Sequence, residues 1–297
     1  MSYLPTGSYF FQKRPQYVEE ATFGTTPTSP AFTSVGSMQD MATNIDISNV
    51  KYRQLGSRDL YQVIKTGEIY GIVFKYQPFN TNFLKYGTEY WSASATGNIA
   101  KSFSLVWSQN INGVENFYLA SGFRTERVDI DVTETAVVVT QTLTGKNIST
   151  PSTTYPGTGT PTYAATDVGT PWSGQSGGSL PLTINALNYD VTRFRISVNQ
   201  NLDRVKPNGE TVIKFLEATN RDVAVDMDMV VQNTTTLADV KTLTARTASY
   251  TLNSGTSSQI SLTNLYLEKY SSSDSPTANK IKMISFAGVA QSVTITN

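Results

Sequence analysis

The feature that most constrains the fold is a pattern that occurs twice. Residues 69–84 and residues 222–237 lie about 150 residues apart, and each begins as an apolar-rich strand, reaches an Asn-Thr pair and continues into a short helical pattern. A strand pair precedes each stretch, at residues 44–65 and 189–217, and four further strand-like runs follow each. Few residues are identical between the stretches, so the order of elements carries the comparison. Because an internal repeat sets the architecture of a chain, the sequence predicts two tandem β modules.

Length and composition narrow the class of protein. The 297 residues leave room for two domains with a buried core. Lys plus Arg equal Asp plus Glu at 23 each, so there is no basic excess with which to hold nucleic acid. The chain contains no Cys and no His. It therefore lacks disulfides, thiol catalysis and the commonest general base and metal ligand, and it suits folding in a reducing cytoplasm.

Neither membrane insertion nor secretion is expected. No apolar run approaches the roughly 18 residues that a membrane span needs. The N-terminus, Met-Ser-Tyr-Leu-Pro, has neither the basic nor the apolar region of a secretion signal.

Residues 1–42 are predicted to form an N-terminal assembly arm. Their four prolines and weak periodicity favour extended or irregular chain. Solvated tails rarely keep large aromatic residues, which suggests that this segment becomes ordered against a partner. The aromatic residues near its start are Tyr3, Tyr9, Phe10, Phe11 and Tyr17.

Residues 43–146 are predicted to form the first module. The run 69–77 is nearly all apolar or aromatic, as in a strand that is covered on both faces. Asn80 or Thr81 can cap a following helix. That helix would carry Phe83, Tyr86 and Tyr90 on one face. Residues 126–132 alternate between apolar and charged side chains, as a strand with one buried face does.

Residues 147–185 have a different composition. Five of the twelve prolines and six of the twenty glycines fall here, and Asp167 is the only charged residue. Such a stretch cannot build a core of its own. It is predicted to be a flexible linker, or a surface loop pinned by Tyr163 and Trp172.

Residues 186–297 are predicted to form the second module. Its strand at 222–230 directs Val223, Val225, Met227 and Met229 to one face, and the acidic residues Asp222, Asp226 and Asp228 to the other. A weak helix then opens at Thr234 or Thr235, and strands close the chain. Both modules are rich in the Thr, Val, Ile and Tyr that sheets favour, so the fold class is mainly β with one short helix in each module.

No constellation of residues points to catalysis. The carboxylate pairs Glu19/Glu20, Asp129/Asp131 and Asp226/Asp228 include two with the i, i+2 spacing of a strand, about 7 Å, near the separation in glycosidases. An exposed polar strand face produces the same spacing far more often. No metal-binding loop or phosphate-binding loop is present in the sequence pattern. We therefore expect no enzyme, no cofactor and no metal.

Four segments together resemble the tail tube proteins of tailed viruses. The first runs Val18-Glu-Glu-Ala-Thr-Phe-Gly-Thr-Thr-Pro27, and it is similar to an N-terminal stretch common in that family. Residues 118–130 with 137–145 resemble the family's paired strands, although Ser121-Gly122 stands where the family usually has Gly-Cys. Residues 194–205 resemble the strand and turn that open a second module, and residues 286–295 resemble the closing hairpin. The order of these segments is more specific than any one of them.

The resemblance implies a tail tube (major tail) protein of a tailed bacteriophage or archaeal tailed virus. Each module would be a small β-barrel or sandwich with one helix, and modules would join edge to edge in a ring. A duplicated subunit can make such a ring from three copies with pseudo-sixfold symmetry, with a hexamer as the alternative. Stacked rings would form a tube through which the viral DNA passes without specific binding. The protein would be made in the host cytoplasm and lie in the virion tail, in contact with itself and with other tail proteins.

Two sets of residues are candidates for function in such a tube. Asp222, Asp226 and Asp228 could face the lumen, where they would repel DNA, or an outer solvated face. Tyr9, Phe10, Phe11 and Tyr17 of the arm could contact a neighbouring ring. The alternatives are another structural β protein of a virion or cell surface, such as a capsid decoration or an adhesin, and a carbohydrate-active β-sandwich enzyme.

Overall fold

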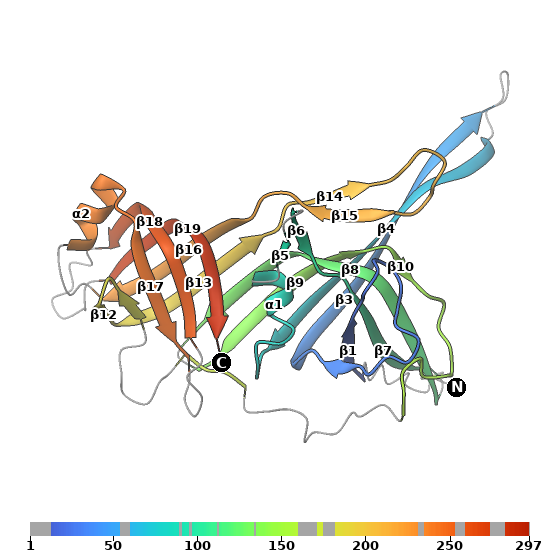
Figure 1. The fold of residues 1–297 in the computed structure, drawn as a ribbon, viewed down its shortest axis with the longest axis horizontal. Coiled ribbons are helices and arrows are strands. Elements are labelled where there is room, and N and C mark those ends of the chain that lie inside the picture. The colour runs from blue at the N-terminus through green and yellow to red at the C-terminus, as the bar shows by residue number, and fades with distance from the viewer. Residues whose placement is uncertain are drawn as a thin grey trace, which may run out of the picture.

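The computed structural model describes most of the chain as β-strands (Figure 1). The described residues are 13–53, 60–88, 91–94, 97–111, 113–133, 135–159, 171–174, 182–230, 235–252, 259–273 and 283–296. The mainly β fold class predicted from the sequence is confirmed, but the sheets are not closed into barrels. Within these residues, no helix is long and apolar enough to cross a membrane.

We call β1 to β10 the first repeat and β11 to β19 the second repeat. The first repeat contains β1 (Lys13–Glu19), β2 (Thr33–Ser34), β3 (Ser37–Arg53), β4 (Leu60–Gln77), α1 (Lys85–Thr88), β5 (Trp91–Ser94), β6 (Gly97–Ala100), β7 (Phe103–Ile111), β8 (Val114–Val132), β9 (Val137–Gly145) and β10 (Asn147–Ile148). The second repeat contains β11 (Leu182–Ile184), β12 (Leu187–Tyr189), β13 (Val191–Asn199), β14 (Leu202–Val205), β15 (Phe215–Ala218), β16 (Asp222–Val230), α2 (Thr235–Thr242), β17 (Arg246–Thr251), β18 (Gln259–Ser273) and β19 (Met283–Thr296).

The two repeats share one strand order. Neighbouring strands of the first repeat run β2-β1-β7-β8-β9-β4-β3, and those of the second run β12-β11-β17-β18-β19-β16-β13. All of these pairs are antiparallel, and the helix follows the corresponding strand in each repeat, α1 after β4 and α2 after β16. The two tandem modules predicted from the sequence are therefore two copies of one topology.

Irregularities in the ladders fix the residue-by-residue correspondence between the repeats. The β8–β9 ladder shifts register after Thr125, and the β18–β19 ladder shifts after Leu267. At the same distance before each shift stands a residue with positive φ, Gly122 (φ 68) and Asn264 (φ 48). The β3–β4 and β13–β16 ladders also shift at matching places, between Met38 and Asp40 and between Val191 and Arg193. Matching bulges indicate that the repeats agree in detail, since a bulge is a defined local feature of a strand pair.

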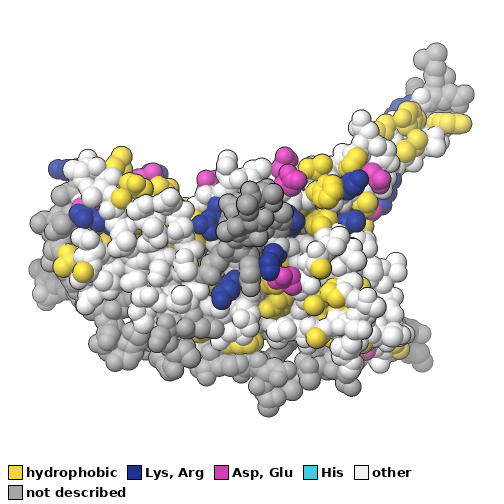
Figure 2. Space-filling model, viewed as in Figure 1, with side chains coloured by type: hydrophobic (Ala, Val, Ile, Leu, Met, Phe, Trp, Pro, Cys, Tyr) yellow, Lys and Arg dark blue, Asp and Glu magenta, His cyan; other side chains and the backbone are white. Residues whose placement is uncertain are grey.

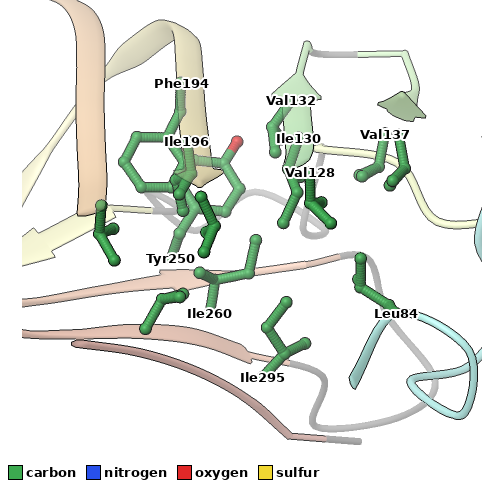
Figure 3. Close-up of a cluster of buried hydrophobic side chains, with 14 of the residues drawn as sticks. Leu84, Val128, Ile130, Val132, Val137, Phe194, Ile196, Tyr250, Ile260 and Ile295 are labelled. Atoms are coloured by element: carbon green, nitrogen blue, oxygen red, sulfur yellow. The ribbon is translucent and has the colours of Figure 1, made fainter. Parts of the chain in front are cut away.

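One pairing joins the repeats into a continuous sheet, and we call it the internal junction. The C-terminal half of β8 lies between β9 and β13, with Val128 opposite Val198 and Ile130 opposite Ile196. All four of these side chains are fully buried. Figure 3 shows that β8 and β13 face the second repeat's β17, β18 and β19 across a shared apolar core. The residues labelled there are Leu84, Val128, Ile130, Val132, Val137, Phe194, Ile196, Tyr250, Ile260 and Ile295.

An aromatic cluster fills the first repeat beside α1. Phe83 is 1% exposed, and its ring centroid lies 4.8 Å from that of Tyr17 and 5.2 Å from that of Phe103. The helix that the sequence predicted here begins later than expected, because α1 starts at Lys85 and leaves Phe83 before it; Tyr90 lies outside the described residues. A Cβ on Gly87 would meet Val128 Cγ2 at 2.0 Å, so glycine permits this close contact with β8.

Residues 13–42 belong to the sheet and not to a free arm. Strand β1 pairs with β7 and β2, and β3 already starts at Ser37, within the range predicted as the arm. These strands have partners of the same kind in the second repeat, where β11 pairs with β17 and β12. The first repeat therefore begins about 30 residues earlier than the sequence pattern suggested.

The described parts of the segment 147–185 are pinned to the fold. Trp172 is 4% exposed, and its backbone N–H donates to the Pro78 carbonyl at 2.9 Å. The Tyr155 ring lies 5.4 Å from that of Phe117, and its hydroxyl donates to Gln16. At Trp172 and Tyr155 the segment therefore packs as a surface loop held to the fold does. Tyr163, the other predicted anchor, lies outside the described residues.

Candidate assembly interface and lumen face

One half of β18 has a neighbour on one side only, within the described part of the chain. Residues 259–265 pair with both β17 and β19, whereas residues 269–273 pair with β19 alone. The corresponding half of β8 pairs with β9 on one side and β13 on the other. We call the side of residues 269–273 that faces away from β19 the open edge of β18.

A second edge of the same kind lies on β3. Strand β3 pairs with β4, and no other ladder is recorded for it among the described residues. Its counterpart β13 pairs with β16 on one side and with β8 on the other. We call the side of β3 that faces away from β4 the open edge of β3. Exposed strand edges present unpaired backbone N–H and C=O groups, so each of these edges is able to accept another strand.

Large apolar side chains are exposed along β3 and β4. Ile45 is 52% exposed and Val63 is 51% exposed, whereas their counterparts in the second repeat, Val198 and Leu216, are fully buried. We call residues 48–53 with 60–67 the projecting hairpin, because they extend beyond the body of the molecule in Figure 1. Figure 2 shows apolar side chains along this projection. Those exposed on it are Val50, Tyr52, Leu60, Tyr61, Val63 and Ile64.

In the second repeat the equivalent hairpin packs on the first repeat. Strands β14 and β15 continue the β13–β16 hairpin, and Arg204 stands opposite Leu216 just as Lys51 stands opposite Val63. The Glu68 backbone N–H donates to the Thr211 carbonyl at 2.9 Å. Arg204 forms an ion pair with Glu126 of β8, with 3.6 Å between Nη2 and Oε2. The hairpin thereby covers the edge of β8 that adjoins the internal junction.

A buried arginine ties this second hairpin to the first repeat. Arg124 of β8 is 8% exposed and donates from Nη1 to the Leu216 carbonyl. Loss of solvent around the guanidinium lowers the pKa of Arg124 to about 10, although the carboxylates of Glu217 and Glu20 oppose this shift. The guanidinium also lies 5.3 Å from the ring centroid of Phe23. Arg124 could not be identified from the sequence, because no charge pattern around it distinguishes it from a surface arginine.

The predicted acidic residues lie on the uncovered surface of the continuous sheet, which we call the polar face. Asp222 and Asp226 are exposed and Asp228 is half-buried, while the intervening side chains of β16 enter the core. Two arginines that the sequence analysis missed stand opposite them on β13, Arg193 across from Asp228 and Arg195 across from Asp226. The alternation of polar and apolar residues over 193–197 is the signal in the sequence that places both arginines on one face of a strand.

Acidic and basic groups share the polar face. Arg193 forms an ion pair with Asp131 at 3.2 Å, and Arg195 lies 3.6 Å from Asp129. The hydrogen bond to Asp131 raises the pKa of Arg193, and the negative charges of Asp131, Asp228 and Asp226 add to this effect. A hollow of 650 Å³ on this face reaches from these arginines to Glu268 and Lys269. The strand 222–230 alone suggested an acidic surface, whereas the assembled sheet has mixed charge.

The predicted arm contacts divide into two groups. Tyr9, Phe10 and Phe11 lie outside the described residues. Tyr17 is 7% exposed and packs against Phe83 and Tyr86 of its own chain. Because its ring is already buried in the first repeat, Tyr17 is not available to a neighbouring ring in the way the sequence predicted.

The other carboxylate pairs take part in hydrogen bonds and ion pairs within the chain. Glu19 accepts hydrogen bonds from Tyr86 and Lys101, at 2.8 and 2.6 Å. Glu20 is buried and accepts from the backbone N–H groups of Gly24 and Gly122, each at 2.8 Å. Within the described residues, no cluster of three or more potential metal ligands occurs. These carboxylates therefore stabilise loops and strands of the fold.

Comparisons with known proteins identify the family of the chain. One solved structure that resembles the chain is the cryo-EM structure of the anti-feeding prophage (AFP) baseplate, 6-fold symmetrised, at 14% sequence identity and a TM-score of 0.30. The match covers 39% of this chain and 90% of that chain. No curated protein matches the chain. The family model described as phage tail tube protein, however, matches residues 12–296. This match spans both repeats, and the chain therefore belongs to the phage tail tube protein family and is a structural component of the tail.

Proposed function

We propose that copies of this subunit close into a ring by pairing the open edge of β18 with the open edge of β3 of the next copy. The observation that carries this proposal is the internal junction, where the corresponding strands β8 and β13 already pair within one chain. The two open edges belong to different surfaces of the subunit, so the contact is head-to-tail. Head-to-tail contacts close into a ring when the rotation permits it.

Two repeats in each chain restrict the size of the ring. A ring of identical chains contains an even number of repeats. If all junctions are equal, the order of its rotational pseudo-symmetry is twice the number of chains. We propose three copies with six repeats, because the resemblance to tail tube proteins implies six modules in a ring of single-module subunits. A hexamer with twelve repeats is the alternative. Stacked rings would then form the tube, which joins other tail proteins at its ends.

The polar face is proposed to line the lumen. It is the surface of the continuous sheet that the core does not cover, and it carries Asp222, Asp226 and Asp228 together with Arg193 and Arg195. Tight binding to DNA requires a basic excess that neutralises several phosphates, and these arginines are balanced by carboxylates. Such a wall would let the genome slide through the tube without specific binding.

Three further proposals follow from the family. Tyr9, Phe10 and Phe11 are proposed to contact the neighbouring ring, since an aromatic segment without a core of its own gains by burial against a partner. The subunit is proposed to be made in the host cytoplasm before it joins the virion. Its role is proposed to be structural and not catalytic, which is consistent with carboxylates that form ion pairs within the chain.

Assembly and the lumen are tested separately. Electron micrographs and native mass spectrometry of the assembled protein should reveal open rings or tubes whose rings contain three chains. A monomer at every concentration and salt condition would contradict the ring, and six chains per ring would favour the alternative.

For the lumen, the double variant Asp226→Lys/Asp228→Lys should assemble but slow or stop genome delivery. The matched control is Asp203→Lys/Glu210→Lys, which makes the same change in net charge at exposed positions of the second hairpin. Unchanged infectivity of the first variant, or an equal defect in the control, would remove the lumen assignment and leave the ring proposal intact.

A further inference from the structure

The internal repeat specifies the contact between two copies residue by residue. We infer that β18 of one copy pairs antiparallel with β3 of the next, with Lys269 opposite Asp46, Tyr270 opposite Ile45 and Ser271 opposite Asn44. The projecting hairpin of the second copy then packs on the second repeat of the first copy. This inference rests on the proposed ring, and it assigns the register and the side chains of its junction.

The register follows from the ladders on both sides of the junction. Along β8, Arg127 comes directly after the register shift with β9, and along β18, Lys269 comes directly after the shift with β19. At the internal junction Arg127 stands opposite Asn199.

The counterpart of Asn199 on β3 is found in the same way. Val198 faces Val223 in the β13–β16 ladder, and Ile45 faces Tyr70 at the equivalent place in the β3–β4 ladder. The residue after Ile45 is Asp46, which takes the position of Asn199. Because a shift of one residue would turn every side chain to the opposite face, the buried face allows no neighbouring register.

The chemistry of the opposed side chains agrees with this register. Lys269 and Asp46 are both exposed and carry opposite charges, a favourable cross-strand pair. Tyr270 and Ile45 occupy the positions of Val128 and Val198, which are fully buried at the internal junction. Ile45 is 52% exposed in the single chain. The junction between copies would therefore bury an apolar pair at the place where the internal junction does.

The projecting hairpin has a matching site on the next copy. At the internal junction, Arg204 of the second hairpin forms an ion pair with Glu126, and Leu216 opposite Arg204 is fully buried. Their counterparts on the projecting hairpin are Lys51 and Val63, which stand opposite each other in the β3–β4 ladder. The counterpart of Glu126 is Glu268, the residue skipped at the register shift in β18.

The contact of the projecting hairpin with the next copy would therefore repeat the ion pair and the buried apolar side chain of the second hairpin. Lys51 and Glu268 are exposed and opposite in charge, and Val63 is 51% exposed. A second copy of this chain explains the exposed apolar surface of the projecting hairpin. The second hairpin covers part of β8 in the first repeat, and the projecting hairpin would cover the equivalent part of β18 in the second repeat of the neighbouring copy.

Cysteine pairing tests the register directly, because the chain contains no cysteine. The variant Asp46→Cys/Lys269→Cys is oxidised with copper phenanthroline after assembly and separated on a denaturing, non-reducing gel. Directly opposed residues of an antiparallel pair lie about 4.5–5.5 Å apart, within the range of a disulfide, so covalent multimers should form. An exposed ion pair contributes little to stability, so the variant should still assemble.

Two control variants accompany it. Arg127→Cys/Asn199→Cys has the same geometry at the internal junction and should form a cross-link within each chain. Ala42→Cys/Lys269→Cys moves one cysteine four residues along β3, about 13 Å, and should give few multimers. Rings or tubes that yield no multimers from Asp46→Cys/Lys269→Cys, or equal amounts from Ala42→Cys/Lys269→Cys, would overturn the register while the proposed ring stands. Failure of the unmodified chain to form rings or tubes would overturn both.

Charge reversal tests the hairpin contact without cysteine. Lys51→Glu and Glu268→Lys should each raise the concentration needed for assembly, by about threefold for an exposed ion pair, and the double variant should restore it. Additive defects in the double variant would mean that these residues do not meet, and would refute the hairpin contact.

Discussion

Replacement of Ile45 by Thr should weaken the contact between copies and leave the fold of each copy nearly unchanged. Thr keeps the β-branched shape that strands favour, so the substitution removes mainly apolar surface. Ile45 is already 52% exposed in the single chain, which limits the cost to folding. In the ring it would lie against Tyr270, in the position where Val198 is fully buried.

The expected effect is about fivefold in the concentration needed for assembly. Full burial of an isoleucine side chain contributes about 1.5–3 kcal/mol, and about half of that remains to be gained at the junction. Thr would lose most of this half, about 1 kcal/mol for each copy. Since 1.4 kcal/mol changes an equilibrium constant tenfold, the critical concentration should rise by about fivefold.

Sedimentation measures this concentration as the protein that stays in the supernatant at the end of assembly. The matched control is Val73→Thr, because Val73 is 37% exposed but its neighbours Ile72 and Phe74 place it on the opposite face of the sheet. The urea midpoint of each unassembled variant checks that both remain folded. An unchanged critical concentration for Ile45→Thr, or an equal rise for Val73→Thr, would refute the burial of Ile45 between copies.

Three predictions concern the fold itself. Phe83→Ala should lower the free energy of unfolding by about 3–5 kcal/mol in urea denaturation, whereas Phe215→Ala, at a side chain that is 46% exposed, should cost far less; equal losses would contradict the central place of Phe83. Gly87→Ala should destabilise by about 1–3 kcal/mol because its Cβ would meet Val128, and an unchanged thermal midpoint would refute that contact. Burial raises the pKa of Tyr250 to about 12, so its contribution is complete below pH 10 and is lost as the pH rises towards 12. Urea midpoints of Tyr250→Phe should therefore fall less between pH 10 and 12 than those of the unmodified chain, and parallel curves would exclude Tyr250 as the titrating group.

The sequence predicted the repeat because the order of strand and helix patterns survives when residue identities do not. It matched residues 69–77 with 222–232, and β4 and β16 hold the same place in the strand order of the two repeats. The short helix after β4 was also predicted, and α1 occupies Lys85–Thr88 there. Alternation within a strand reports which side chains are buried, and that information was sufficient for the core of each repeat.

The strand edges and the charge of the polar face could not be predicted in the same way. Alternation does not reveal which strands are neighbours, so Arg193 and Arg195 could not be placed opposite Asp228 and Asp226 before the pairing was known. For the same reason, the packing of Tyr17 against Phe83 and Tyr86 could not be predicted from the sequence. Prolines around β1 suggested irregular chain, but the pairing of β1 with β7 overrides that local preference.

The duplication gives the internal junction and the proposed junction between copies different physical requirements, and the side chains available to each differ accordingly. Within a chain the covalent connection raises the effective concentration of one repeat at the other, so the internal junction needs less contact surface. It accommodates Arg124, a buried charge whose Nε has no hydrogen-bond partner among the described residues. A junction between separate copies must also overcome about 4–15 kcal/mol of lost translational and rotational freedom. The first repeat supplies what that requires, in β3 and β4 of 17 and 18 residues that run into the projecting hairpin with its exposed apolar side chains. The hairpin with more exposed apolar side chains therefore lies on the side of the subunit where no peptide bond supports the contact.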